Sequence, residues 1–452
     1  MAQALPVEGP LREQTHRVPG GLRAALGALL VLVVHLQPPA PVFRYDATRY
    51  WGGAQALLDE RSAVVEGLLD LRGVLTTLLY LPAAVVTRLA GDDLAGAAVL
   101  AENAVLIGLI GVVLLPALVS IWRPAGPWTV VCCAFGTAVV TGGFAPFPLT
   151  DLWAAALLLT VVAALHRQGR GWLVLAGVAA GAAVNIRPAT LLPLAAVGVA
   201  VLLARRWAAL WAALGATLAL APQVALNRSR GTSWLPVPPG TGGLTELQAS
   251  FASYVVRYDT VVAGPDAEPR LFSCSPAMVD ALAGEVPRSP AGLASAFLHH
   301  LPQSVPFAAQ KVGAALHWPL STPYLTPAPG VDVVFAVLVT AVSVAGVAAL
   351  LRLSTRERGR TTLGRVAVLL VWLGSLATLV TSATETRFAL PLVLIGVAGC
   401  ATVVAGGRPQ GRSAWWWVAG TVVAVAAVYA VGVAGLQHPF AGMATPELCS
   451  GR

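Results

Sequence analysis

The chain is poor in charge. Only 11% of its 452 residues are charged and 57% are hydrophobic, whereas a soluble domain carries roughly 25% charged residues. A soluble protein of this composition would present large apolar patches to water. The apolar residues instead come in runs of roughly 20, which is about the length that spans a bilayer as a helix. The composition therefore argues against one large soluble fold and predicts an all-α polytopic membrane protein.

Lysine is almost absent, because Lys311 is the only one and the other 28 basic residues are arginines. The net charge of +8 does not indicate a nucleic-acid partner, since no basic stripe with interleaved aromatic residues is present. In a membrane protein, the location of the arginines is more informative than their total.

Hydrophobic segments divide the chain into about eleven predicted transmembrane helices. They cover residues 21–40, 100–122, 128–146, 151–166, 171–186, 189–204, 207–226, 331–351, 366–383, 388–405 and 415–434. We expect an N-terminal membrane module (1–226), an extracytoplasmic loop (227–330), and C-terminal spans with an outer tail (331–452).

Two large loops, 41–99 and 227–330, are predicted on the same side of the membrane. Within the second, segments 245–262 and 291–318 carry apolar residues at helical spacing with polar breaks. This pattern predicts helices that lie in the membrane interface.

Charge divides the loops into two sets. One set holds 15 basic and three acidic residues, and the other holds 14 basic and 18 acidic residues. The basic residues of the first set are Arg12, Arg17, Arg23, Arg123, Arg167, Arg170, Arg205, Arg206, Arg352, Arg356, Arg358, Arg360, Arg365, Arg408 and Arg412. Cytoplasmic loops are enriched in basic residues. We therefore predict a multi-pass plasma-membrane protein with its N-terminus in the cytoplasm and its C-terminus outside.

The first hydrophobic segment has two interpretations. Arginines precede it, as in a signal peptide, but the sequence LQPPAPVF that follows is a poor cleavage site. We expect an uncleaved anchor, with a cleaved signal peptide as the alternative.

Acidic residues occur where the predicted outer loops meet the spans. Asp46 and Tyr50 lie four residues apart in FRYDATRYW (43–51), so on a helix they share one face. Asp151 lies in PFPLTDLW (146–153). Each aspartate is either an N-cap, a common role for this residue, or a chemical group at the mouth of the bundle.

Arginines occur at the same predicted level. Arg187 precedes a helix-breaking proline in VNIRPATLLP (184–193), and Glu385 and Arg387 lie two residues apart in TSATETRFALP (381–391). Arg187 is either an interfacial anchor or an anion site, because the arginine fork matches phosphate. Glu385 and Arg387 are a local ion pair or an interfacial anchor. Arg228 lies in NRSRG (227–231), where Asn227 and Ser229 also match the weak glycosylation pattern.

These segments, in this order, resemble the GT-C superfamily of polyprenyl-phosphate-sugar-dependent membrane glycosyltransferases, which includes protein O-mannosyltransferases and aminoarabinose transferases. The resemblance covers roughly residues 20–400, and the order and topology carry it. The matching positions are Tyr45, Asp46 and Tyr50, the stretch 71–91, Pro148, Thr150 and Asp151, the Gly-rich stretch 177–188, and Glu385, Arg387, Phe388, Leu390 and Pro391.

The resemblance implies a GT-C-like bundle that moves a sugar from a polyprenyl-phosphate donor to a hydroxyl of a glycan, lipid or protein in the cell envelope. By that resemblance Asp46 is the general base and Asp151 a supporting acid. Arg187, Arg387 and Arg228 are candidates for the donor phosphate, and Tyr50 and Glu385 for positioning the substrate. No cofactor is expected with certainty. A divalent metal is not indicated, because Ala47 follows Asp46 and a carboxylate pair is not evident.

Two other functions fit a polytopic membrane protein. A transporter or flippase of lipid-linked sugars would need a polar site near the midplane and, often, internal repeats, and the sequence shows neither. A non-catalytic membrane scaffold is the third hypothesis, and an intact Asp46 argues against it.

The five cysteines divide by location. Cys132, Cys133 and Cys400 fall within predicted spans, where cysteine acts as a small apolar residue. Cys274 and Cys449 fall outside the membrane, where disulfides persist, and are a candidate pair.

Overall fold

The computed structural model describes residues 19–450, apart from 37, 41, 60–61, 263–269, 327, 357–361, 408–411, 438 and 443. Of the arginines assigned to the cytoplasmic set, Arg12, Arg17, Arg358, Arg360 and Arg408 lie outside the described residues.

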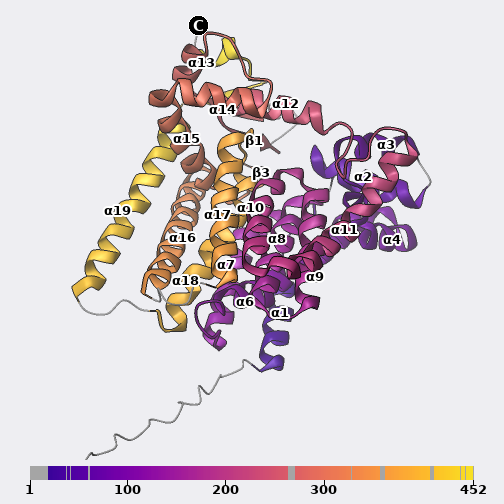
Figure 1. Cartoon of the computed structure of the whole chain (residues 1–452), viewed down its shortest axis with the longest axis horizontal. Helices are drawn as coiled ribbons and strands as arrows, with labels where there is room; N and C mark the ends of the chain where they lie inside the picture. The colour runs from indigo at the N-terminus through magenta and orange to yellow at the C-terminus, as the bar shows by residue number, and fades with distance from the viewer. Residues whose placement is uncertain are drawn as a thin grey trace, which may run out of the picture.

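Long apolar helices dominate the structure (Figure 1). The first half contains α1 (Gly20–His35), α5 (Ala95–Leu109) with its continuation α6 (Leu115–Val119), α7 (Pro127–Thr141), α8 (Thr150–His166), α9 (Arg170–Ile186), α10 (Leu191–Arg205) and α11 (Ala209–Ser229). The second half contains α16 (Pro329–Arg356), α17 (Leu363–Thr381), α18 (Leu390–Thr402) and α19 (Arg412–Gly435). Each predicted span coincides with one of these helices, so the chain is a membrane-embedded, largely helical protein.

The number of crossings is less definite than the number of helices. Among the described residues, seven helices are long and apolar enough to cross a membrane. One of them, Pro188–Ser229, holds both α10 and α11. The helices α8 and α9 have 17 residues each, which at 1.5 Å per residue gives about 25 Å, short of a bilayer core of roughly 30 Å. The count of about eleven spans therefore stays a prediction.

Small residues let neighbouring helices approach closely. Where α9 packs against α11, a Cβ atom on Gly177 would lie 1.9 Å from the carbonyl oxygen of Ala212, and one on Gly215 would lie 2.1 Å from that of Val174. Any side chain at either position would collide with backbone. Such contacts are typical of helix packing in lipid, where the hydrophobic effect does not drive helices together.

Buried amides attach the first large loop to these helices. That loop contains α2 (Asp46–Leu58), α3 (Ser62–Leu71), the 3-10 turn η1 (Val74–Leu78) and α4 (Leu81–Ala90). Asn185 of α9 accepts a hydrogen bond from the Leu75 N–H at 2.9 Å, and Gln223 of α11 accepts one from the Val74 N–H at 2.8 Å. Both amides are buried.

Asn227 continues this network and is not a glycosylation site. Its side chain is fully buried, and its amide nitrogen donates to the carbonyl oxygens of Leu235 and Val237, both at 2.8 Å. A glycan would have to be attached to this side-chain nitrogen, which is buried and already donates two hydrogen bonds. Asn227 therefore has a structural role.

The second large loop adds a small sheet to the largely helical fold. Helix α12 (Thr241–Ala252) ends within the predicted 245–262 helix, and β1 (Val255–Val261) follows it. Strand β1 is central in a sheet of order β3-β1-β2-β4 with β2 (Arg270–Cys274), β3 (Tyr324–Leu325) and β4 (Pro439–Ala441). The sequence VVRYDTV is rich in β-branched and aromatic residues, which favour strands. Strand β4 brings the C-terminal tail into this loop.

Helices in the rest of this loop agree with the prediction. The segment 291–318 forms α14 (Pro290–His299) and α15 (Leu301–Leu316), separated at His300. Lys311 of α15 is fully buried and donates to the carbonyl oxygens of Ala252 at 3.2 Å and Ser382 at 2.8 Å. The only lysine of the chain therefore joins the second loop to the end of α17.

The predicted disulfide is present, since Cys274 of β2 is bonded to Cys449 of the short helix α20 (Pro446–Cys449). Cys132, Cys133 and Cys400 are free thiols. The bridge and strand β4 together fix the C-terminal tail to the sheet.

We expect maleimide labelling of the denatured protein to modify three cysteines without reductant and five after reduction. Because the bridge closes a long loop, Cys449→Ser should lower the unfolding free energy by roughly 2–4 kcal/mol, measured by thermal unfolding in detergent. Cys132→Ser is the matched control and should cost much less. Five labelled cysteines without reductant would contradict the bridge.

Candidate active site

Arg387 is the centre of a buried cluster of charges. It lies in the 3-10 turn η7 (Thr386–Ala389) that precedes α18, and its side chain is 8% exposed. Its Nη2 lies 2.7 Å from Oδ2 of Asp46, its Nε donates to Oε2 of Glu385, and its Nη1 lies 3.8 Å from Oδ2 of Asp151. One guanidinium group is thus shared by three carboxylates.

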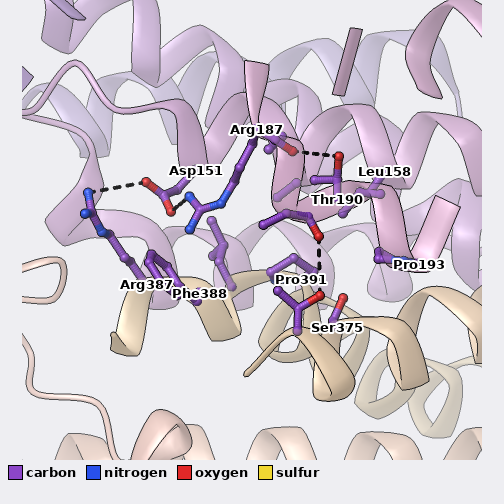
Figure 2. Close-up of a pocket in the computed structure, with 14 residues that line it drawn as sticks. Asp151, Leu158, Arg187, Thr190, Pro193, Ser375, Arg387, Phe388 and Pro391 are labelled. Carbon is purple, nitrogen blue, oxygen red and sulfur yellow. Dashed lines mark hydrogen bonds and ion pairs between the residues drawn. The ribbon is translucent and has the colours of Figure 1, made fainter. Parts of the chain in front are cut away.

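Asp151 lies between two arginines, as Figure 2 shows. Its side chain is 2% exposed, and its Oδ1 accepts a hydrogen bond from Nη1 of Arg187. Its Oδ2 has no hydrogen-bond partner in the described structure. Arg187 follows the last residue of α9 and precedes Pro188, so the predicted helix break is confirmed.

Both arginines, Arg187 and Arg387, contact the aromatic ring of Phe388. The Cζ atom of Arg187 lies 4.4 Å from the centre of the Phe388 ring, and that of Arg387 lies 5.6 Å from it. These distances suit cation–π contacts, which hold two like charges near each other.

Asp46 is the most accessible carboxylate of the cluster, with 29% of its side chain exposed against 2% for Asp151 and 4% for Glu385. Neither aspartate is an N-cap: that position belongs to Tyr45 in α2 and to Leu149 in α8. Burial raises the pKa of Asp46, but the charges of Arg387 and Arg72 outweigh burial and lower it to about 2. Asp46 is therefore an anion at neutral pH.

Glu385 has the opposite shift. Burial raises the pKa of Glu385 to about 6. The charge of Arg387 lowers this pKa, but the negative charges of Asp46 and Asp151 raise it and so oppose Arg387. Thr260 of β1 donates to Oε1 of Glu385 at 3.2 Å. The sheet of the second loop therefore touches the charged cluster directly.

Tyr50 acts on the cluster through Arg72. Its phenol oxygen accepts a hydrogen bond from Nε of Arg72 at 3.1 Å, and the charge of Arg72 acts on Asp46. Tyr50 therefore positions Arg72, whose charge acts on Asp46.

Arg228 lies apart from the cluster, and its contact with a donor phosphate stays a prediction. It lies exposed on α11, with its Cζ atom 4.5 Å from the centre of the Trp234 ring. The neighbouring Asn227 points into the buried amide network, and consecutive residues on a helix cannot face the same direction.

Several residues of the site were not singled out in the sequence. Arg72 gave no signal beyond a charge in the first loop. Tyr324, another such residue, accepts a hydrogen bond from the Ala47 N–H at 3.3 Å. Thr260 was assigned to a helix. A prediction of a strand there would have placed Thr260 and Tyr258 on the same face, because side chains two residues apart on a strand point in the same direction.

A small cavity opens beside the cluster (Figure 2). Its volume is about 40 Å³. Asp151, Arg187 and Arg387 line one side, and Leu158, Pro193 and Pro391 line the other. The arrangement offers fixed positive charge, one carboxylate oxygen without a hydrogen-bond partner and an adjoining apolar wall.

Within the described part of the chain, no three His, Cys, Asp or Glu side chains are grouped to hold a metal ion. The carboxylates of the cluster are each near an arginine instead.

Comparison of the chain with protein-family models, curated proteins and solved structures finds no match.

Replacing Arg387 with methionine should destabilise the protein strongly, because it leaves three carboxylates buried with less compensating charge. Breaking a buried ion pair in this way costs roughly 3–5 kcal/mol. Arg228→Met is the matched control, since it removes an exposed arginine at a similar level of the bundle, and it should cost at most about 1 kcal/mol. Equal unfolding midpoints for the two variants would contradict the central role of Arg387.

The pH dependence of stability should reveal Glu385. Between its ordinary pKa of 4.5 and the folded value of about 6, the unfolded chain loses the proton while the folded protein keeps it. The stability of the wild type relative to Glu385→Gln should therefore fall by on the order of 2 kcal/mol as pH rises from 4 to 7. Taking this difference removes the contribution of histidines that titrate in the same range. A difference that is constant or rises with pH would contradict the shift, and Glu246→Gln, at an exposed position, is the control.

Proposed function

We propose that the protein is a GT-C type glycosyltransferase that moves a sugar from a polyprenyl-phosphate donor to an acceptor hydroxyl on the extracytoplasmic side of the membrane. The proposal rests on the order of the sequence segments and on one structural observation. Residues from those segments, which lie up to 341 positions apart, form one charged cluster with the most accessible acid at its edge.

The cluster has the groups that this reaction needs. The acceptor hydroxyl attacks the anomeric carbon, its proton passes to a carboxylate, and the bond between that carbon and the phosphate oxygen breaks. Asp46 is the carboxylate with the greatest access to a substrate, and a base must lie within hydrogen-bond reach of the hydroxyl. Arg187 and Arg387 supply positive charge for the phosphate that leaves with the bonding electron pair.

Arg387 links the donor to the base. A carboxylate with a pKa of about 2 is a weak base. A donor phosphate would compete for the guanidinium group that now pairs with Asp46, and losing that partner raises the pKa of a carboxylate. We infer that donor binding strengthens Asp46 as a base.

The surroundings of the cluster suit a lipid with a charged head. The apolar wall formed by Leu158, Pro193 and Pro391 adjoins the two arginines. The Cys274–Cys449 bridge belongs to the sheet whose strand β1 contacts Glu385. Disulfides persist in oxidising compartments, which supports an extracytoplasmic site.

The position of the cluster argues against the transporter hypothesis. Transporters keep their ionisable residues near the midplane. Here Asp151 is in the first turn of α8, Arg187 follows the end of α9, and Arg387 precedes α18. All of these positions are helix ends.

The test uses purified full-length protein in liposomes with polyprenyl-phosphate donors that carry labelled sugars, and measures transfer or release of the label. Because Asn cannot take the proton, Asp46→Asn should lower turnover by roughly 10²–10⁴-fold. The variant also loses the ion pair with Arg387, so its thermal unfolding midpoint should fall, and turnover is compared at a temperature at which both proteins remain folded. Asp70→Asn is the matched control, since Asp70 lies in the same loop but is 58% exposed and pairs with Arg230.

Two results would overturn the proposal. Turnover by Asp46→Asn at the wild-type rate would remove the assigned base. Binding of the donor lipids without release of sugar from any of them would favour a scaffold or transporter.

A further inference from the structure

A second, much larger cavity lies at the opposite end of α8 and α10. Its volume is about 620 Å³, and α8, α9, α10 and α11 each contribute to its wall, for example through Val161, Ala180, Val197 and Ala213. The lining is apolar apart from Arg206. A hydrocarbon chain suits such a wall, because a polar ligand would lose its hydrogen bonds to water there.

One end of the cavity lining is the turn between α10 and α11. This turn is η6 (Arg206–Ala208), and Arg206 and Trp207 both line the cavity. Arg206 has a φ of 47°, a left-handed conformation that is uncommon for residues other than glycine. Arg205 and Arg206 are exposed, and neither has an ion pair within the described part of the chain.

The loops at this end of the helices are positively charged. The two loops at this end, 166–170 and 205–208, hold four arginines and no acidic residue. Arg170 lies over the ring of Trp211, with its Cζ atom 5.4 Å from the ring centre, and Trp211 is adjacent in sequence to the lining residues Leu210 and Ala212. An apolar cavity with a cationic rim is complementary to an amphiphile that has an anionic head.

We propose that this cavity binds an anionic phospholipid, with one acyl chain between α8, α9, α10 and α11 and the headgroup phosphate at Arg205 and Arg206. Basic pockets between transmembrane helices bind anionic headgroups, and tryptophan favours the level of the headgroups. The site is independent of the proposed sugar transfer, because it shares no residue with the charged cluster.

The donor lipid is a less suitable occupant. The charged cluster lies at the start of α8 and Arg206 follows the end of α10, so the cationic end of the large cavity is about 20 Å of helix away from the cluster. The apolar linings of the two cavities approach each other at Pro193 and Leu194. The small cavity beside the cluster has a volume of about 40 Å³ and is lined by Arg187 and Arg387, neither of which lines the large cavity.

The experiment compares dioleoyl phosphatidylglycerol with dioleoyl phosphatidylcholine, which have identical chains and differ in headgroup charge. Native mass spectrometry of the full-length protein measures the affinity for each. We expect phosphatidylglycerol to bind roughly tenfold more tightly. The double variant Arg205→Gln/Arg206→Gln should abolish this preference, whereas Arg23→Gln, on α1 and outside the cavity lining, should keep it.

A second pair of variants tests the chain site. A Cβ atom on Gly198, which lines the cavity, meets nothing within 4 Å. A side chain can therefore start there without meeting backbone, and Gly198→Leu should weaken binding of both lipids by occupying part of the cavity. Gly420→Leu on α19 adds the same side chain in open space away from the cavity and is the control. Equal thermal unfolding midpoints for all variants confirm that they fold.

Three outcomes would overturn the inference. They are equal affinity for the two phospholipids, a preference that survives Arg205→Gln/Arg206→Gln, and displacement of phosphatidylglycerol by an unlabelled polyprenyl phosphate. The last would assign the cavity to the donor chain.

Discussion

The shared guanidinium group of Arg387 is the interaction on which the charged end of the structure depends. A buried cation is costly unless its partners compensate for lost hydration, and its partners here are Asp46, Asp151 and Glu385. Of these three carboxylates, only Glu385 is close to Arg387 in the sequence. The other two require the first loop and α8 to meet the turn before α18, so a local charge requirement constrains the arrangement of the whole bundle.

The two large loops are held in place by polar contacts with the helix ends. Asn185 and Gln223 bind backbone groups of the first loop, and Lys311 binds the ends of α12 and α17. Buried polar groups that are fully bonded specify one arrangement, because any shift leaves them unpaired at a cost. These hydrogen bonds therefore fix the two loops, and with them the positions of Asp46 and Thr260 in the cluster.

The two ends of the bundle have different electrostatic characters. At one end, arginines are neutralised by buried carboxylates around a small cavity. At the other, Arg205 and Arg206 border a large apolar cavity without a described acidic partner. The first arrangement suits chemistry on a charged group, and the second suits the retention of a lipid with an anionic head. The same helices, α8 and α10, line both cavities.

The sequence by itself determined the membrane-embedded helices, the break after Arg187, the candidate residues at helix ends and the pairing of Cys274 with Cys449. These features follow from composition, local periodicity and compartment. Tertiary structure alone decided that Asp46, Asp151 and Glu385 share Arg387, that Arg228 lies apart from them, and that 255–261 is a strand. Hydrophobic periodicity did not separate strand from helix in 245–262, and sheet partners such as 439–441 are distant in sequence. Contacts between residues far apart in sequence depend on the tertiary fold, which a local sequence pattern does not specify.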